Sequence, residues 1–153
     1  TNLGYLYGMG LGVAQDYAEA IRWYRQAAEA GDPIGMNNLG LMHQNGWGVS
    51  RDYDLAREWY QKAAEAGYPV AMRNLGWLYQ SGNGVAQDYG QARVWYQKAA
   101  AAGEVTAMAN LAYLYANGLG TARDDAQARA WHKKAAAAGA VTAVVINNSN
   151  LAQ

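Results

Sequence analysis

The sequence predicts an all-α fold, a right-handed superhelical α-solenoid of stacked antiparallel helix pairs. Two observations predict this fold: the same residue types return every 36 positions without an insertion, and each 36-residue unit holds start and stop signals for two helices. The most regular columns are Gly12, Gly48, Gly84 and Gly120, then Asp16, Asp52, Asp88 and Asp124, and then Trp23, Trp59, Trp95 and Trp131. Because many columns agree at one spacing, the repeat is a specific signal.

The period divides the chain into units of a single repeat domain. These are a truncated first repeat over residues 1–32, full repeats over 33–68, 69–104 and 105–140, and a terminal half-repeat over 141–153. Each full unit is expected to hold a helix A followed by a helix B, which predicts eight or nine helices in all.

Helix A of the unit 69–104 is predicted from Pro69 to about Ser81. Proline suits the first turn of a helix because the N–H that it lacks would be unpaired there. Apolar residues then recur at helical spacing until a glycine-rich turn permits positive φ. These residues are Met72, Leu75, Leu78 and Tyr79, followed by Gly82-Asn83-Gly84.

Helix B of the same unit is predicted to begin after Asp88 and to end at Gly103. The carboxylate of Asp88 can accept hydrogen bonds from the free N–H groups of the first turn, so the Asp column is interpreted as helix caps. Carboxylates one repeat apart are also too widely separated to act as a general acid/base pair. Small residues such as Ala92 would let neighbouring helices approach, and the Trp and Tyr columns would fill the space between units.

The unit resembles the Sel-1-like repeat, a cousin of the tetratricopeptide repeat. The resemblance rests on the pattern Ala71-x-x-x-Leu75-Gly76-x-x-Tyr79-x-x-Gly82-x-Gly84-Val85-x-x-Asp88-x-x-x-Ala92-x-x-Trp95-Tyr96-x-x-Ala99-Ala100-x-x-Gly103. It covers nearly the whole chain. Departures from the pattern gather near the C-terminal end and comprise Ala112 for Gly, Thr121 for Val, Asp125 for Tyr and His132 for Tyr.

The composition narrows the classes of partner that the chain is expected to bind. The chain has 12 Lys and Arg against 12 Asp and Glu, with a pI near 6.6, so no charge excess would attract nucleic acid or an anionic membrane. The apolar runs are too short for a membrane span, and the sequence shows no signal peptide. Without cysteine, disulfides and thiolate chemistry are excluded, but cytoplasmic, periplasmic and secreted locations all remain compatible.

No motif indicates an enzyme. The sequence contains no Gly-x-Ser-x-Gly, Ser-x-x-Lys, His-Glu-x-x-His or phosphate-loop pattern in a suitable context. His43 and His132 both occupy columns otherwise held by Tyr, so each is expected to replace an aromatic side chain in packing. We therefore expect no catalysis, no cofactor and no metal.

Function is expected in the columns that vary, because a solenoid uses its repeated columns for stacking. The resemblance to tetratricopeptide repeats implies that helix A lines the concave surface. A stripe of helix-A positions facing away from the core leucines then provides aromatic anchors and hydrogen-bonding groups for a peptide. The predicted partner-binding residues are Tyr5, Asn37, Leu41, Gln44, Arg73, Trp77, Gln80 and Tyr113. An alternative stays open, in which these aromatics only pack against the next unit.

The resemblance implies a protein-interaction scaffold or adaptor, since members of the family are commonly adaptors in multiprotein complexes and, in bacteria, act in signalling, envelope or host-contact roles. The alternative is a cell-wall-ligand binder or a hydrolase-like enzyme of the repeat family. Weak self-association through the chain ends is also expected. Net charge rises from −2 over residues 1–32 (two Arg, four acids) to +2 over 105–140 (four bases, two acids), and Leu3 and Leu6 lack a preceding helix pair. A chance distribution of charges is the competing explanation.

Overall fold

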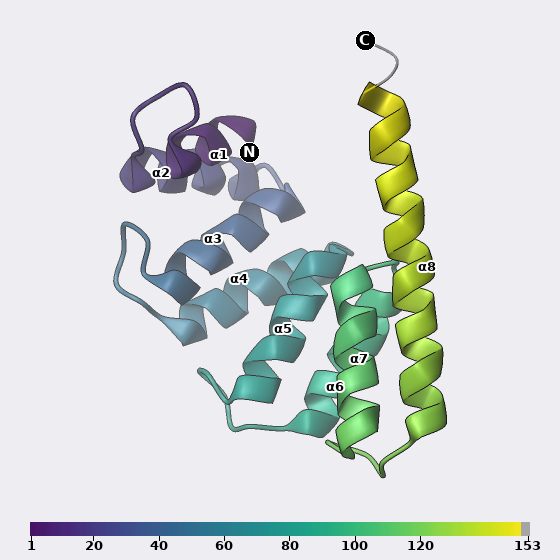
Figure 1. The fold of residues 1–153 in the computed structure, drawn as a ribbon. Helices are drawn as coiled ribbons and strands as arrows, with labels where there is room; N and C mark the ends of the chain where they lie inside the picture. The colour runs from purple at the N-terminus through teal and green to yellow at the C-terminus, as the bar shows by residue number, and fades with distance from the viewer. Residues whose placement is uncertain (151–153) are drawn as a thin grey trace.

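The computed structural model describes the backbone of residues 1–150 and the side chains of residues 1–139. Within this range the chain forms eight α-helices and no strand, stacked in sequence order as antiparallel pairs (Figure 1). The predicted α-solenoid is confirmed. The A helices are α1 (Asn2–Met9), α3 (Pro33–Asn45), α5 (Pro69–Ser81) and α7 (Val105–Asn117). The B helices are α2 (Tyr17–Glu29), α4 (Tyr53–Glu65), α6 (Tyr89–Ala101) and α8 (Asp125–Asn150).

The predicted caps are confirmed at both ends of the helices. Asp88 accepts a hydrogen bond from the backbone N–H of Gln91 at 2.9 Å, and the other aspartates of its column bond the first turn of their own B helices. Each A helix ends at a glycine in the left-handed region, as at Gly82 with a φ of 71°. The turn is then tied back, because the N–H of Asp88 donates to the carbonyl of Tyr79 at 2.9 Å.

Within a pair, the two helices approach closely at one glycine. A Cβ atom added to Gly40 would lie 2.5 Å from the ring of Tyr60, and one added to Gly76 would lie 2.6 Å from the ring of Tyr96. Both tyrosines are fully buried. The glycine of helix A is therefore required by the tyrosine of helix B, which confirms the predicted role of the small residues.

The hydrophobic core lies at the junctions between units. In the described residues, each of three buried clusters joins the B helix of one unit to the A helix of the next: α2 to α3, α4 to α5, and α6 to α7. The half-buried Trp59, Trp95 and Trp131 each pack from the following B helix onto one of these clusters. The Trp and Tyr columns thus fill the space between units, as predicted.

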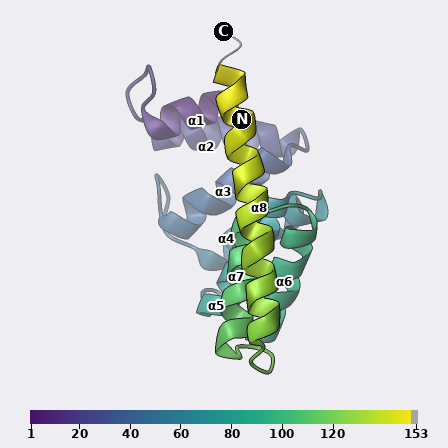
Figure 2. The ribbon, with the colours of Figure 1, turned by 45° about the vertical axis from the view of Figure 1, so that its right-hand side comes forward.

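The helix expected after Gly139 is not formed. Instead α8 continues from Asp125 to Asn150 as one rod (Figure 2). After the equivalent Gly31, Asp32 caps the next helix through the N–H of Ile34, and a proline follows. Neither residue type follows Gly139, and the run of alanines before it favours helix. The half-repeat predicted over 141–153 therefore belongs to α8 as far as Asn150, and residues 151–153 lie outside the described range.

Candidate functional site

Each A helix presents one large apolar side chain at the same position of the repeat. These are Tyr5 on α1, Leu41 on α3, Trp77 on α5 and Tyr113 on α7, here called the apolar row. Tyr5 and Tyr113 are each 51% exposed and Trp77 is 36% exposed. Leu41 is half-buried because it also packs against the cluster between α4 and α5. The outward orientation predicted from the sequence is found for Tyr5, Trp77 and Tyr113, whereas Leu41 is exposed only in part.

The two glutamines of the predicted site are engaged inside the pairs. The hydroxyl of Tyr60 donates to Oε1 of Gln44 at 2.7 Å, and the hydroxyl of Tyr96 donates to Oε1 of Gln80 at 2.8 Å. Burial raises the pKa of both tyrosines above the ordinary value, so both hydroxyls stay protonated and act as donors. Gln44 and Gln80 are half-buried, and each has its side-chain oxygen bonded to a tyrosine of the same helix pair.

Asn37 does not lie on the surface. It is 2% exposed, and its Oδ1 accepts a hydrogen bond from Nδ2 of Asn74 on the neighbouring A helix at 2.9 Å. The exposed placement predicted for Asn37 is wrong because position 37 faces α5, not solvent. The amide of Asn74 thus bonds another side-chain amide and not a backbone group.

Arg73 is the only Lys, Arg, Asp or Glu in the four A helices. Its Nε lies 3.5 Å from Oε1 of Glu104, and its side chain is 30% exposed. Glu104 also caps α7 by accepting from the N–H of Ala107, so one carboxylate serves both groups. The B helices are far more charged; α4 alone carries Asp54, Arg57, Glu58, Lys62 and Glu65. The A-helix face is therefore close to uncharged.

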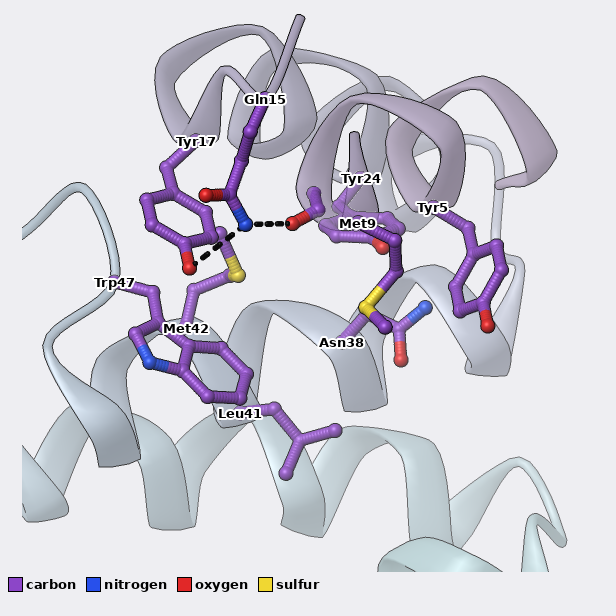
Figure 3. Close-up of a pocket in the computed structure, with 10 residues that line it drawn as sticks. Tyr5, Met9, Gln15, Tyr17, Tyr24, Asn38, Leu41, Met42 and Trp47 are labelled. Carbon is purple, nitrogen blue, oxygen red and sulfur yellow. Dashed lines mark hydrogen bonds between the residues drawn. The ribbon is translucent and has the colours of Figure 1, made fainter. Parts of the chain in front are cut away.

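A cavity of about 460 Å³ opens beside the first two residues of the apolar row, between α1, α2, α3 and the turns that follow α1 and α3 (Figure 3). None of the residues that line it is charged. They are Tyr5, Gly8, Met9, Gln15, Tyr17, Tyr24, Asn38, Leu41, Met42 and Trp47. The cavity is therefore bounded mainly by aromatic and aliphatic groups.

One wall of the cavity is fixed by a small network. Nε2 of Gln15 donates to the carbonyl of Gly8 at 2.8 Å and lies 3.1 Å from the hydroxyl of Tyr17. The ring of Tyr17 stacks on Trp47 with centroids 6.1 Å apart and planes 6° apart. These contacts hold the two aromatic rings in position without a bound partner.

Sequence reasoning found Tyr5 and Leu41 but missed the rest of this cavity. Trp47 lies in the turn after α3, where helical periodicity gives no information about orientation. A signal was present, because a large aromatic between Gly46 and Gly48 replaces the Leu, Asn and Leu found in the other turns. Tyr17 and Asn38 were missed because both belong to repeated columns, whereas function was expected in the columns that vary.

The two histidines differ in their exposure to solvent. His43 is half-buried in the Tyr column of helix A, and burial, the largest effect, lowers its pKa despite the nearby carboxylate of Asp52. His132 is exposed, so its expected role in packing is wrong. The facing position holds Ala112, whose methyl group occupies the space that glycine leaves for tyrosine elsewhere.

Two further kinds of feature, metal centres and membrane-spanning helices, are absent from the described part of the chain. It contains no group of three or more His, Cys, Asp or Glu residues placed to hold a metal ion. Nor does any of its helices combine the length and apolarity needed to cross a bilayer.

The family model of the Sel1 repeat matches the chain four times in succession, over residues 1–32, 33–68, 69–104 and 105–139. The chain belongs to the Sel1 repeat family. Sel1 repeats are typically found in protein-interaction scaffolds, and no specific partner follows from membership. No curated protein matches the chain at a significant level.

Several solved structures of Sel1-type proteins are similar to this chain. One is c5321, a protective antigen of uropathogenic Escherichia coli with an SLR fold: 43% identity, TM-score 0.84, covering 90% of this chain and 30% of that protein. A Sel1 repeat protein from Oxalobacter formigenes has 40% identity and TM-score 0.85, covering 90% and 56%. Cysteine-rich protein B of Helicobacter pylori has 26% identity and TM-score 0.64, covering 86% and 95%. The chain thus spans about a third and about half of the first two structures.

Proposed function

We propose that this Sel1-repeat chain is a non-catalytic scaffold that binds a protein or peptide partner along its A-helix face. One observation carries the proposal: the apolar row places an exposed or half-exposed large side chain at the same position of four successive A helices. Trp and Tyr, which supply three of the four side chains of the apolar row, are among the residues that contribute most to binding at protein interfaces.

The charge distribution supports the same face. Desolvating charged groups opposes association, and the cores of interfaces are depleted of charged residues. The A helices carry Arg73 alone, and that guanidinium already lies near Glu104. A partner could therefore cover this face without burying unpaired charges, whereas covering α4 would bury five charged side chains.

The alternative class is a hydrolase-like enzyme or a binder of cell-wall ligands. No contact or cluster among residues 1–139 favours it over a scaffold. A turnover screen run beside the peptide screen below separates the two classes, because a scaffold yields binders and no product.

The first test of the proposal uses peptides selected from a phage-displayed random library against the intact chain. Trp77→Ala or Arg73→Ala should weaken binding of the selected peptides by about 1–3 kcal/mol, because both side chains belong to A helices and are partly exposed to a partner. Affinity is measured by fluorescence polarisation, and circular dichroism checks that the fold is retained.

The matched control is Arg22→Ala. Arg22 also pairs with a glutamate, Glu19 at 2.7 Å, but it lies on α2, a B helix. It should leave peptide affinity unchanged. Equal affinity in wild type, Trp77→Ala and Arg73→Ala would place the binding surface elsewhere.

A further inference from the structure

We propose that the cavity between α1 and α3 receives one bulky, uncharged side chain of the partner, such as Trp, Phe, Met or Leu. We propose also that the Asn38 side-chain amide donates a hydrogen bond to the partner's backbone beside it. This inference rests on the proposed function and adds the chemistry of the partner at one position.

The residues that line the cavity disfavour binding of a charged side chain. A charged side chain entering the cavity would lose its hydration and meet no counter-charge, because the ten lining residues include no acid and no base. An apolar side chain would instead cover the faces of Tyr17 and Trp47 and the side chains of Met9 and Met42. The volume, about 460 Å³, lies in the range of cavities that bind ligand groups.

Asn38 supplies a free donor at this place. The equivalent Asn74 uses its Nδ2 to bond Oδ1 of Asn37 in the preceding unit. In the first unit the residue equivalent to Asn37 is Thr1, whose hydroxyl donates to Asp32 instead. Among the described residues, Nδ2 of Asn38 has no hydrogen-bond partner. Figure 3 shows the amide beside the end of the Met9 side chain, with its nitrogen on the side of Tyr5.

The position of the cavity favours a polypeptide as the source of that side chain. Tyr5 and Leu41 belong both to the cavity wall and to the apolar row. A segment anchored here can therefore continue along the same uncharged face toward Trp77. Its backbone would present carbonyl groups to Asn38, an amide being well suited to bond a peptide group.

The test uses four probes of known chemistry, the N-acetyl amides of Trp, Met, Glu and Lys, titrated into the intact chain and followed by ¹⁵N NMR. The Trp and Met probes should give saturable shifts at the Trp47 indole N–H and the Asn38 side-chain NH₂. The Glu and Lys probes should bind at least about tenfold more weakly, since a charge is left without a partner. Equal binding of all four, or shifts confined to other residues, would overturn the inference.

Two variants locate the site. Tyr5→Ala should weaken the Trp probe about tenfold, whereas Tyr113→Ala should leave it unchanged. The two tyrosines occupy the same repeat position with the same 51% exposure, but only Tyr5 lines the cavity. Asn38→Ala should weaken the Trp probe about threefold to tenfold through loss of one hydrogen bond. An unchanged affinity in Asn38→Ala would remove that residue from the site.

The selected peptides separate failure of this inference from failure of the proposed function. Peptides that weaken with Trp77→Ala but not with Tyr5→Ala or Asn38→Ala would leave the scaffold proposal standing and overturn the anchor cavity. Peptides insensitive to all three changes would overturn both. A small organic compound that binds the cavity while no peptide does would assign the site to a free ligand and would also overturn the inference.

Discussion

The units 69–104 and 105–140 share one plan but differ at the contact between their two helices. In the first, Tyr96 packs against Gly76 and bonds Gln80. In the second, the equivalent positions hold Ala112, Ala116 and His132. Ala112 is fully buried and His132 is exposed. The three positions differ together because they form one contact. Where His132 replaces the tyrosine, no ring needs the space beside a glycine, and no hydroxyl needs a glutamine oxygen as acceptor.

The largest effect that would test this comparison is expected from Tyr96→Ala. Removing a fully buried ring leaves a cavity between α5 and α6, which should lower the free energy of unfolding by about 3–5 kcal/mol. His132→Ala, the equivalent change in an exposed residue, should alter it by less than about 0.5 kcal/mol. Urea denaturation measures both. Similar losses in the two variants would show that the units do not differ as described.

A smaller effect is expected from Gly76→Ala. The new methyl group would lie 2.6 Å from the Tyr96 ring, so helices α5 and α6 must separate, at a cost of about 1–3 kcal/mol. Gly8→Ala is the matched control: its Cβ would meet nothing nearer than 3.7 Å, and the gain in helix propensity should stabilise by about 0.5–1 kcal/mol. Thermal and urea melts should therefore shift in opposite directions. A stabilising Gly76→Ala would contradict the contact.

The contact of Tyr96 should also affect how the free energy of unfolding depends on pH above pH 9. Burial raises the pKa of Tyr96 in the folded state, whereas the unfolded value is about 10. Its stabilising contribution is thus complete below pH 10 and falls as pH rises from 10 toward the folded pKa, by up to about 1.4 kcal/mol per pH unit. Tyr96→Phe should flatten this decline relative to wild type. Urea melts between pH 9 and 11.5 give the two slopes, and identical slopes would count against a buried Tyr96 hydroxyl.

The smallest effect is expected from Gln80→Ala. It removes the acceptor 2.8 Å from the Tyr96 hydroxyl and should cost about 0.5–1.5 kcal/mol. The reverse change in the next unit, Ala116→Gln, should be nearly neutral because no tyrosine hydroxyl faces it. If Ala116→Gln stabilises as much as Gln80→Ala destabilises, the hydrogen bond does not explain the difference between the units.

The helix caps and the glycine turns could be predicted because each occurs in several units of the sequence. The caps at Asp16, Asp52, Asp88 and Asp124, and the glycine turns, follow from local rules that hold within one unit. The positions of Trp77 and Tyr113 followed from the helical period, since a residue opposite a core leucine points outward.

The features that escaped prediction depend on neighbours. The period of α3 predicts that position 37 belongs to the exposed stripe, but the contact with Asn74 of α5 buries Asn37. Trp47 lies in a turn without a period. The continuation of α8 through Gly139 depends on what the following residues lack, a cap and a proline, and a column-by-column match does not register such a loss.

The junction between units has a consequence for how such chains change length. Ala71, Leu75 and Leu78 of α5 pack onto α4, and the same three residue types, Ala107, Leu111 and Leu114, pack from α7 onto α6. Deleting residues 69–104 would therefore place α7 on α4 with the same apolar contacts that α5 makes now. Gene segments encoding one 36-residue unit can be lost or duplicated without creating a new kind of interface, so the number of units can vary during evolution while every junction stays intact.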